Sequence, residues 1–295
     1  MTYKTIRFEE EDGIATITLS RLDRLNAYTL EMRKELMSVL DRVDATDSIG
    51  AVIFTGDGKV FCAGADLHGD IPVFETDADE EKSFINPDGS LNYSASSARD
   101  GGGMFVLRLF QCLKPLIAAV NGPAVGIGAT MTLPMDARLA SENARYGFVF
   151  SKIGSVPEAA SSWFLPRLVG ISQALDWCYS GRVFSAAEAL AGGLVRSVHP
   201  ANGLLPAARA LARSYIDGVA PVSVALIRQM LWRGLTMSHP MEAHRVDSRG
   251  ILSRAHSADV QEGVNAFKEK RAPVFPVRVS SEMPDYFPWW EEPEF

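Results

Sequence analysis

Strand-like patterns gather in the first half of this 295-residue chain, and helical patterns fill the second half. Residues 4–20 alternate in polarity on both sides of Asp12-Gly13, a dipeptide typical of hairpin turns. The apolar spacing predicts helices over 29–45 and 107–113 and buried strands over 51–56 and 116–120. Beyond Ala159 it predicts helices near 159–168, 171–180, 186–191, 204–217, 221–235, 240–256 and 259–269. This order favours an α/β core with a helical C-terminal section over an evenly alternating doubly wound sheet.

Two segments depart from these patterns. Residues 68–103 are rich in Asp, Glu, Ser, Asn and Gly, which predicts a long surface insertion. Residues 273–295 carry several prolines and the pair Trp289-Trp290, so they cannot form a long regular helix, and the aromatic rings must pack on the body or on a neighbouring subunit. We therefore predict an α/β core over 1–200, a helical oligomerisation section over 201–272 and a Pro/aromatic-rich tail over 273–295.

Composition narrows the function classes. The net charge of -7 gives no basic field for nucleic acid or an anionic membrane. The three cysteines, Cys62, Cys112 and Cys178, are widely spaced, which argues against a disulfide framework or a zinc site. No histidine pair has metal-binding spacing, so no metal is expected. The N-terminus lacks an apolar signal run and no stretch reaches about 20 apolar residues, which predicts a cytoplasmic protein without a membrane partner.

Two glycine-rich turns each follow a buried strand. The first is Phe61-Cys62-Ala63-Gly64-Ala65-Asp66-Leu67, and the second runs from Asn121 through Gly126-Ile127-Gly128 to Thr130. Small residues let the backbone approach a ligand closely, and N–H groups at a helix start favour negative charge. A dinucleotide fingerprint is set aside because Met131 stands where that motif needs a glycine. A serine hydrolase is disfavoured because the chain has no GxSxG elbow.

Together these turns resemble the paired oxyanion turns of the enoyl-CoA hydratase/isomerase (crotonase) family. The resemblance covers roughly residues 5 to 270 and includes Arg24-Leu25-Asn26-Ala27, Ser180-Gly181-Arg182 and Ala191-Gly192-Gly193-Leu194-Val195. It implies a spiral core of ββα units and an acyl-CoA thioester substrate that itself carries coenzyme A, with no tightly bound cofactor. It also implies a homotrimer or a hexamer built as a dimer of trimers. Apolar Leu226, Met230, Leu231 and Trp232 suggest the interface, unless they are simply core.

The resemblance assigns the oxyanion donors to the N–H groups of Ala63 and Ile127. Two such donors would stabilise the enolate that forms when the α-carbon loses a proton, at about 3–4 kcal/mol per donor. The two glutamates that hydratases of the family use are replaced here by Thr130 and Phe150, which cannot exchange protons near neutrality. Glu158, after Pro157, matches a single glutamate in a subset of Δ3-Δ2-enoyl-CoA isomerases and is the predicted base, although an acid after proline is also an ordinary helix start.

Further residues are expected at coenzyme A by the same resemblance. They are Arg24, near the nucleotide end, with Leu25, Ala27, Ala65, Asp66 and Leu67, and also Phe267 and Lys270 on a helix that in relatives reaches the coenzyme A of a neighbouring subunit. The alternative for this last helix is a solvated end whose cations suit the helix dipole. An acid at the place of Asp66 more often braces its loop than touches substrate. Asp70, Arg99 and Asp100 flank the insertion and could line the acyl end, although solvated loop charges are the commoner interpretation.

Three functions therefore stay open. The favoured one is isomerisation of 3-enoyl-CoA to 2-enoyl-CoA, because one carboxylate can remove the proton from C2 and return it to C4. A 2-enoyl-CoA hydratase or related lyase that uses Glu158 is the first alternative. A non-catalytic acyl-CoA-binding protein that keeps only the oxyanion turns is the second.

Overall fold

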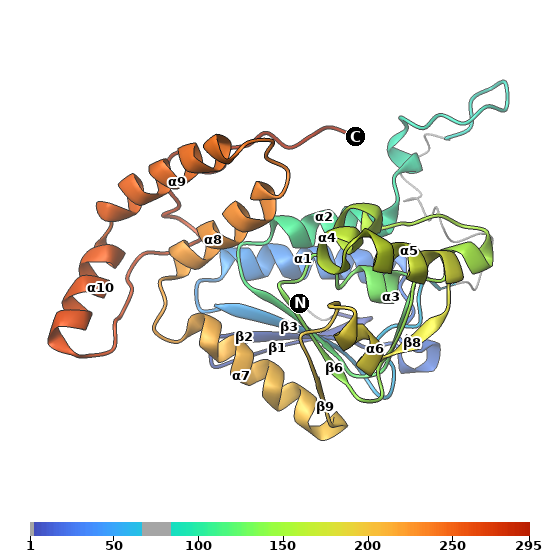
Figure 1. Ribbon diagram of the computed structural model, residues 1–295, viewed down its shortest axis with the longest axis horizontal. Coiled ribbons are helices and arrows are strands. Elements are labelled where there is room, and N and C mark those ends of the chain that lie inside the picture. Colours follow the sequence, from blue (N-terminus) through green and yellow to red (C-terminus); the bar gives the residue numbers. More distant parts are fainter. Residues whose placement is uncertain (1–2, 67–83) are drawn as a thin grey trace.

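A six-stranded sheet organises the computed structural model, which describes residues 3–66 and 84–295 (Figure 1). The strand order is β1-β2-β3-β4-β6-β9, with β1 at Ile6–Glu11, β2 at Ile14–Leu19, β3 at Ala51–Gly56, β4 at Leu116–Val120, β6 at Ala137–Ser141 and β9 at Ser197–His199. Within this sheet of the described residues, β1 and β2 pair antiparallel across the predicted hairpin at Asp12-Gly13, and the other pairs are parallel. A smaller sheet joins β5 (Pro123–Val125), β7 (Arg145–Gly147) and β8 (Val183–Ser185).

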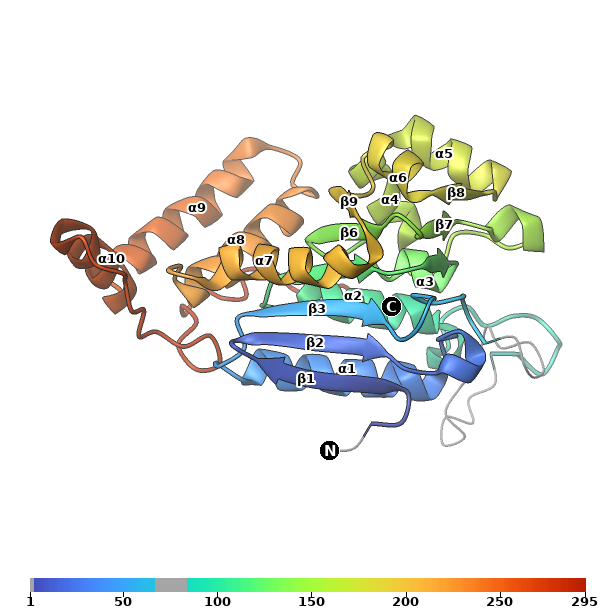
Figure 2. The same cartoon turned by 90° about the horizontal axis from the view of Figure 1, so that it is seen from below.

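Helices cover both faces of the larger sheet (Figure 2). On one face α1 (Leu30–Ala45) and α2 (Gly101–Gln111) share a buried cluster with Val52 and Phe54, and on the other α7 (Leu204–Ile216) packs on Ala51 and Ile53. Successive residues of a strand point to opposite faces, so a strand covered on both sides must be apolar throughout. This explains why the run AVIFTG of β3 is buried at every position.

The remaining helices form two groups. Near the smaller sheet lie α3 (Ile127–Thr130), α4 (Ser161–Val169), α5 (Ile171–Ser180) and α6 (Ala186–Ala191). The helix α8 (Pro221–Gly234) packs against the body through buried Arg228, which binds Asp136, whereas α9 (Pro240–Ala255) and α10 (Ala258–Glu269) extend away from it (Figure 1). The α/β class with a helical C-terminal section is confirmed. The helix α7 begins after residue 200 but packs on the sheet of the core. The division into 1–200, 201–272 and 273–295 stays a prediction. No single helix of the described residues could span a membrane, and 201–216 with α8 passes only as a pair bent by 104°.

Packing within the chain bears on two alternatives that the sequence leaves open. Leu226 is only 3% exposed, because it packs against Val279 of the tail, whereas Leu231 is 70% exposed as expected. The tail aromatics pack back on the body, with Trp289 beside the Leu226 cluster and Trp290 against the guanidinium of Arg233. The tail therefore completes the core around α8, and only part of the predicted exposed surface is exposed.

The helix α2 begins earlier than its apolar spacing predicts. It starts at Gly101, inside the predicted insertion, and not near Leu107. Asp100 is the reason, because its carboxylate accepts hydrogen bonds from the N–H groups of Gly102 and Gly103 at 2.9 and 3.0 Å. An N-cap of this kind can begin a helix through residues that have no apolar pattern.

Candidate active site

The two glycine-rich turns lie against each other. Cys62 forms a parallel bridge with Ala124, and the N–H of Val125 donates to the carbonyl oxygen of Cys62 at 3.1 Å. The N–H groups of Phe61 and Cys62 both reach the carbonyl oxygen of Pro123, also at 3.1 Å. Segments about sixty residues apart in the sequence thus run side by side, as the pairing of the two motifs predicts.

This approach is close enough to require glycine at one position in particular. A Cβ on Gly128 would lie 2.2 Å from the carbonyl oxygen of Cys62, a distance that no real side chain tolerates. Gly126, two residues earlier, has φ of +52° and lies near Gly64 of the first turn. Only glycine adopts that backbone conformation at little cost. The glycines of the second turn therefore fix its distance from the first.

The two predicted oxyanion donors differ in this structure. Ile127 is the first residue of α3, and among the described residues no group accepts a hydrogen bond from its N–H. The N–H of Ala63 instead donates to the carbonyl oxygen of Leu25 at 3.1 Å. Leu25 lies in an exposed loop with φ of +51°. Of the two predicted donors, the Ile127 N–H is therefore without an acceptor in the described part of the chain, whereas the Ala63 N–H is already bonded within the protein.

Glu158 does not begin a helix. The helix α4 starts at Ser161, and Ala159 and Ala160 have φ of +53° and +50° in between. The interpretation of Pro157-Glu158 as an ordinary helix start is therefore wrong. Ser161 holds the Glu158 carbonyl oxygen through its N–H at 2.9 Å and its hydroxyl at 2.6 Å. The chain thus turns sharply after Glu158 and fixes its backbone.

The Glu158 carboxylate points back into the protein beside the second turn. Thr130 at the end of α3 donates its hydroxyl to Oε1 at 2.6 Å. A Cβ placed on Gly102 would lie 2.7 Å from Glu158 Oε2 and 2.8 Å from Cδ1 of Ile127, so both side chains meet over this glycine. The Glu158 carboxylate therefore lies beside the Ile127 side chain and binds Thr130 of the short helix that Ile127 begins.

Burial raises the pKa of Glu158 to about 7, since a desolvated carboxylate loses the solvation of its charged form. The hydrogen bond from Thr130 acts in the opposite direction, and the negative charge of Asp100 raises the pKa further. A carboxylate with a pKa near neutrality can both take up and return a proton. Tyr28 lies in the same surroundings, and burial raises the pKa of its phenol well above the usual value.

Sequence comparison identifies the chemistry that this geometry serves. Residues 9–87 and 89–278 match the family described as enoyl-CoA hydratase/isomerase. The chain belongs to this family. Its curated relatives include enoyl-CoA hydratase ACTT3 of Alternaria alternata, which is 39% identical over 267 residues that make up 90% of this chain and 84% of that protein. The 1,2-epoxyphenylacetyl-CoA isomerase of Escherichia coli is 33% identical, over 90% of this chain and 95% of its own length.

Solved structures agree with the family assignment. A putative enoyl-CoA hydratase from Streptomyces coelicolor A3(2) superposes with a TM-score of 0.81 at 28% identity, over 93% of this chain and 95% of the other. An enoyl-CoA hydratase from Bacillus anthracis superposes with a TM-score of 0.79, also at 28% identity, over 92% and 99% of the two chains. The protein is therefore an enzyme of the enoyl-CoA hydratase/isomerase family with the crotonase-like fold expected from its motifs.

By resemblance, Thr130 and Phe150 stand at the positions of the two hydratase glutamates. Neither side chain is an acid, and the structure shows what each one contacts instead. The Thr130 hydroxyl binds Glu158, and the Phe150 ring is buried in the core beside Phe148. The sequence reasoning treated Thr130 only as a missing acid and missed its role as partner of Glu158. It also treated Asp100 as a solvated charge, yet Asp100 binds the N–H of Ala159. The Asp-Gly-Gly-Gly sequence at 100–103 was the available signal, because Asp is a preferred N-cap.

The residues predicted at coenzyme A fall into two groups. Leu25, Ala27, Ala65 and Asp66 lie together, because Tyr28 forms a bridge with Ala65 and the Asp66 carboxylate pairs with Arg21 at 2.9 Å. Asp66 thus braces its loop, as the alternative expectation stated. Arg24 lies in the same loop, partly exposed and 3.6 Å from the carboxylate of Asp23.

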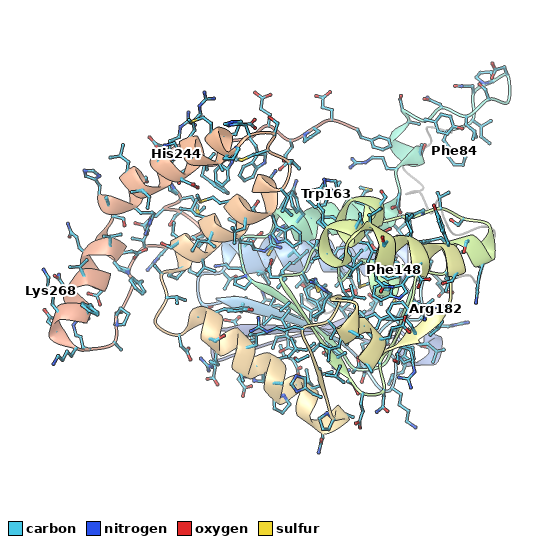
Figure 3. The ribbon with its side chains drawn as sticks, in the orientation of Figure 1. Phe84, Phe148, Trp163, Arg182, His244 and Lys268 are labelled. Atoms are coloured by element: carbon cyan, nitrogen blue, oxygen red, sulfur yellow. The ribbon has the colours of Figure 1, made fainter. Side chains whose placement is uncertain are left out.

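The second group lies elsewhere in the chain. Phe267 is 85% exposed on α10, and Lys270 directly follows that helix. In Figure 3, Lys268 of the same helix is at the opposite end of the molecule from Phe148 and Arg182. These two contacts stay predictions for a neighbouring subunit, and Leu67 lies outside the described residues. Residues 3–66 and 84–295 contain no group of three His, Cys, Asp or Glu side chains that could hold a metal ion.

Proposed function

We propose that this enzyme converts 3-enoyl-CoA to 2-enoyl-CoA. The Glu158 carboxylate takes the proton from C2, and the electrons of that C–H bond move into a dienolate whose charge rests on the thioester oxygen. The Ile127 N–H binds this oxygen, and the Ala63 N–H joins it once released from Leu25. Protonated Glu158 then returns the proton to C4, which leaves the double bond between C2 and C3.

The observation that carries this proposal is a single buried carboxylate with a pKa of about 7 that is bonded to the short helix whose first N–H, that of Ile127, has no acceptor among the described residues. Isomerisation needs one group that both accepts and releases a proton, whereas hydration usually needs a second group to activate water. Asp100 is the acidic neighbour of Glu158, and its two oxygens are already occupied by three backbone N–H groups. The geometry thus supplies one proton carrier.

The direct test is to incubate the purified protein with 3-hexenoyl-CoA and measure 2-hexenoyl-CoA by liquid chromatography. In deuterated water the product should carry less than full label at C4, because one carboxylate moves the same proton. Absence of any 2-enoyl product would reject the isomerase assignment.

Hydration of 2-enoyl-CoA is the second candidate, favoured by the names of the relatives, several of which are called enoyl-CoA hydratases. Hydration of crotonyl-CoA that disappears in Glu158→Gln would support it. If CoA esters shift the melting temperature but neither reaction occurs, the third candidate, an acyl-CoA-binding protein without activity, is favoured.

Activity should rise with pH, because Glu158 must be ionised to accept the C2 proton. We expect kcat/KM to increase through a pH of about 7 and then level off. Thr130→Val removes the hydrogen bond that stabilises the ionised form, so the rise should move to higher pH by about one to two units. Thr132→Val is the matched control, because the buried Thr132 hydroxyl donates to the carbonyl oxygen of Ala129 and has no bond to Glu158. An unchanged profile in Thr130→Val would contradict the assignment of Glu158.

We also propose that three or six copies assemble. Large apolar side chains are exposed along the C-terminal helices, where one chain offers them no cover, and they are Leu231, Ile251, Leu252 and Phe267. Exposed apolar surface of this kind is typical of an interface. Sedimentation equilibrium should give three or six times the chain mass of 32.1 kDa.

A further inference from the structure

Asp100 joins two parts of the active site that are distant in the sequence. Its Oδ1 accepts the N–H of Gly102 at 2.9 Å, and its Oδ2 accepts the N–H of Gly103 at 3.0 Å. Oδ2 also accepts the N–H of Ala159 at 2.5 Å, the residue that follows Glu158. One half-buried carboxylate therefore binds the first turn of α2 to the backbone that carries Glu158.

The backbone at this point needs such support. Ala159 and Ala160 both have positive φ, a conformation that costs a non-glycine residue about 1–2 kcal/mol. Strained residues persist where the surrounding contacts hold them in place. Ser161 binds the peptide oxygen of Glu158, and Asp100 binds the N–H at the other end of the same peptide unit.

We propose that Asp100 is a positioning residue for Glu158: by binding the Ala159 N–H to the start of α2, it fixes where the Glu158 carboxylate lies relative to Gly102 and Ile127. The carboxylate then needs only the Thr130 hydroxyl to complete its orientation. Asp100 does not touch the substrate in this role, and its effect on catalysis passes through Glu158.

The negative charge of Asp100 adds an electrostatic effect. Among residues 3–66 and 84–295, the titratable groups that interact with Glu158 are Asp100 before α2, Cys62 in the first turn and Tyr28 before α1. Burial raises the pKa of the Cys62 thiol to about 12 and that of the Tyr28 phenol well above its usual range, so both are neutral near pH 7. Arg33 acts on Tyr28. Asp100 is thus the charged group that favours the protonated form of Glu158.

Two substitutions separate position from charge. Asp100→Asn can keep its amide oxygen at the place of Oδ2, so it retains the bonds to Gly103 and Ala159 but loses the charge. Asp100→Ser keeps a good N-cap for α2, but its shorter side chain cannot also reach Ala159. Ser185→Ala, which removes the cap of α6, is the control for loss of a helix cap elsewhere.

We expect Asp100→Ser to lower kcat by about ten- to a hundredfold with little change in KM, because a small displacement of a catalytic group has such effects. Asp100→Asn should keep kcat within a few-fold of the wild type at high pH. The rise of kcat/KM with pH should move to lower pH, because the charge that favours protonated Glu158 is gone. Ser185→Ala should lower the melting temperature without changing kcat. Wild-type kcat in Asp100→Ser, or equal losses in the two Asp100 variants, would overturn the proposal.

The rate measurements rest on the proposed function, so a second readout is independent of turnover. Infrared titration of the Glu158 carboxyl band, assigned by its absence in Glu158→Gln, reports its protonation without substrate. We expect the midpoint to fall in Asp100→Asn and the band to broaden or shift in Asp100→Ser. Identical bands and midpoints in all three proteins would reject the positioning role, even if 3-enoyl-CoA proves not to be the substrate.

Discussion

Glu158→Gln should lower kcat for 3-enoyl-CoA isomerisation by about 10²–10⁴-fold, the usual contribution of a positioned acid-base group. The amide keeps the size of the side chain and can still bind the Thr130 hydroxyl, but it cannot accept the C2 proton. KM should change little, because the groups proposed to bind the thioester oxygen and coenzyme A do not include the Glu158 carboxylate. Initial rates at pH 8 across a range of substrate concentrations measure both quantities.

Stability separates a lost base from a damaged fold. The folded-state pKa of Glu158 lies above its ordinary value, so its contribution to stability is present at low pH and is lost as pH rises through about 7. At pH 8 the wild type therefore carries a buried charge that the glutamine variant lacks, and the variant should melt no lower. Glu142→Gln, at an exposed acid, is the matched control and should keep full activity. Full activity in Glu158→Gln would remove this residue from the mechanism.

The sequence predicts the early part of the fold well, because its strands have strong patterns. The dipeptide Asp12-Gly13 predicts the hairpin, and two apolar runs predict the strands β3 and β4. The structure confirms all three. The strand β6 has no such pattern, because its ARLAS sequence contains no β-branched residue and carries a buried arginine at its second position. Arg138 binds four backbone carbonyl oxygens, three within the preceding segment 132–135 and one of Leu194, 56 residues further along the chain, and no apolar pattern reveals these bonds.

The sequence likewise predicts some residues of the candidate site and misses others. Motifs and resemblance bring out Ile127, Ala63 and Glu158, because their neighbours in the sequence define them. The contacts of Asp100 and Thr130 with the Glu158 segment span 59 and 28 residues, and only the folded chain brings them together. The hydrogen bond from the Ala63 N–H to the Leu25 carbonyl oxygen could not be predicted from the sequence either, because every residue carries the same backbone carbonyl group.

Gly128→Ala is expected to damage both the site and the fold. The new Cβ would lie 2.2 Å from the carbonyl oxygen and 3.0 Å from the carbonyl carbon of Cys62, which are backbone atoms and cannot rotate away. The two turns must separate, which should cost about 1–3 kcal/mol of stability, as overpacking does elsewhere. The Ile127 N–H moves with its neighbour, so we expect kcat to fall about a hundredfold. Thermal unfolding and steady-state kinetics measure the two effects.

Substitutions at two other glycines test whether the close contact with the Cys62 backbone causes the expected losses in Gly128→Ala. Gly126 has φ of +52° but only one atom near its Cβ position, at 4.0 Å, so Gly126→Ala should show the cost of the backbone conformation without the clash. Gly234 ends α8 with no atom within 4 Å, and Gly234→Ala should leave both rate and melting temperature unchanged or raise the latter slightly. If Gly128→Ala behaves like Gly234→Ala, the spacing of the turns does not set the position of the Ile127 donor. If it is worse than Gly126→Ala in rate, close backbone approach is what builds the oxyanion site.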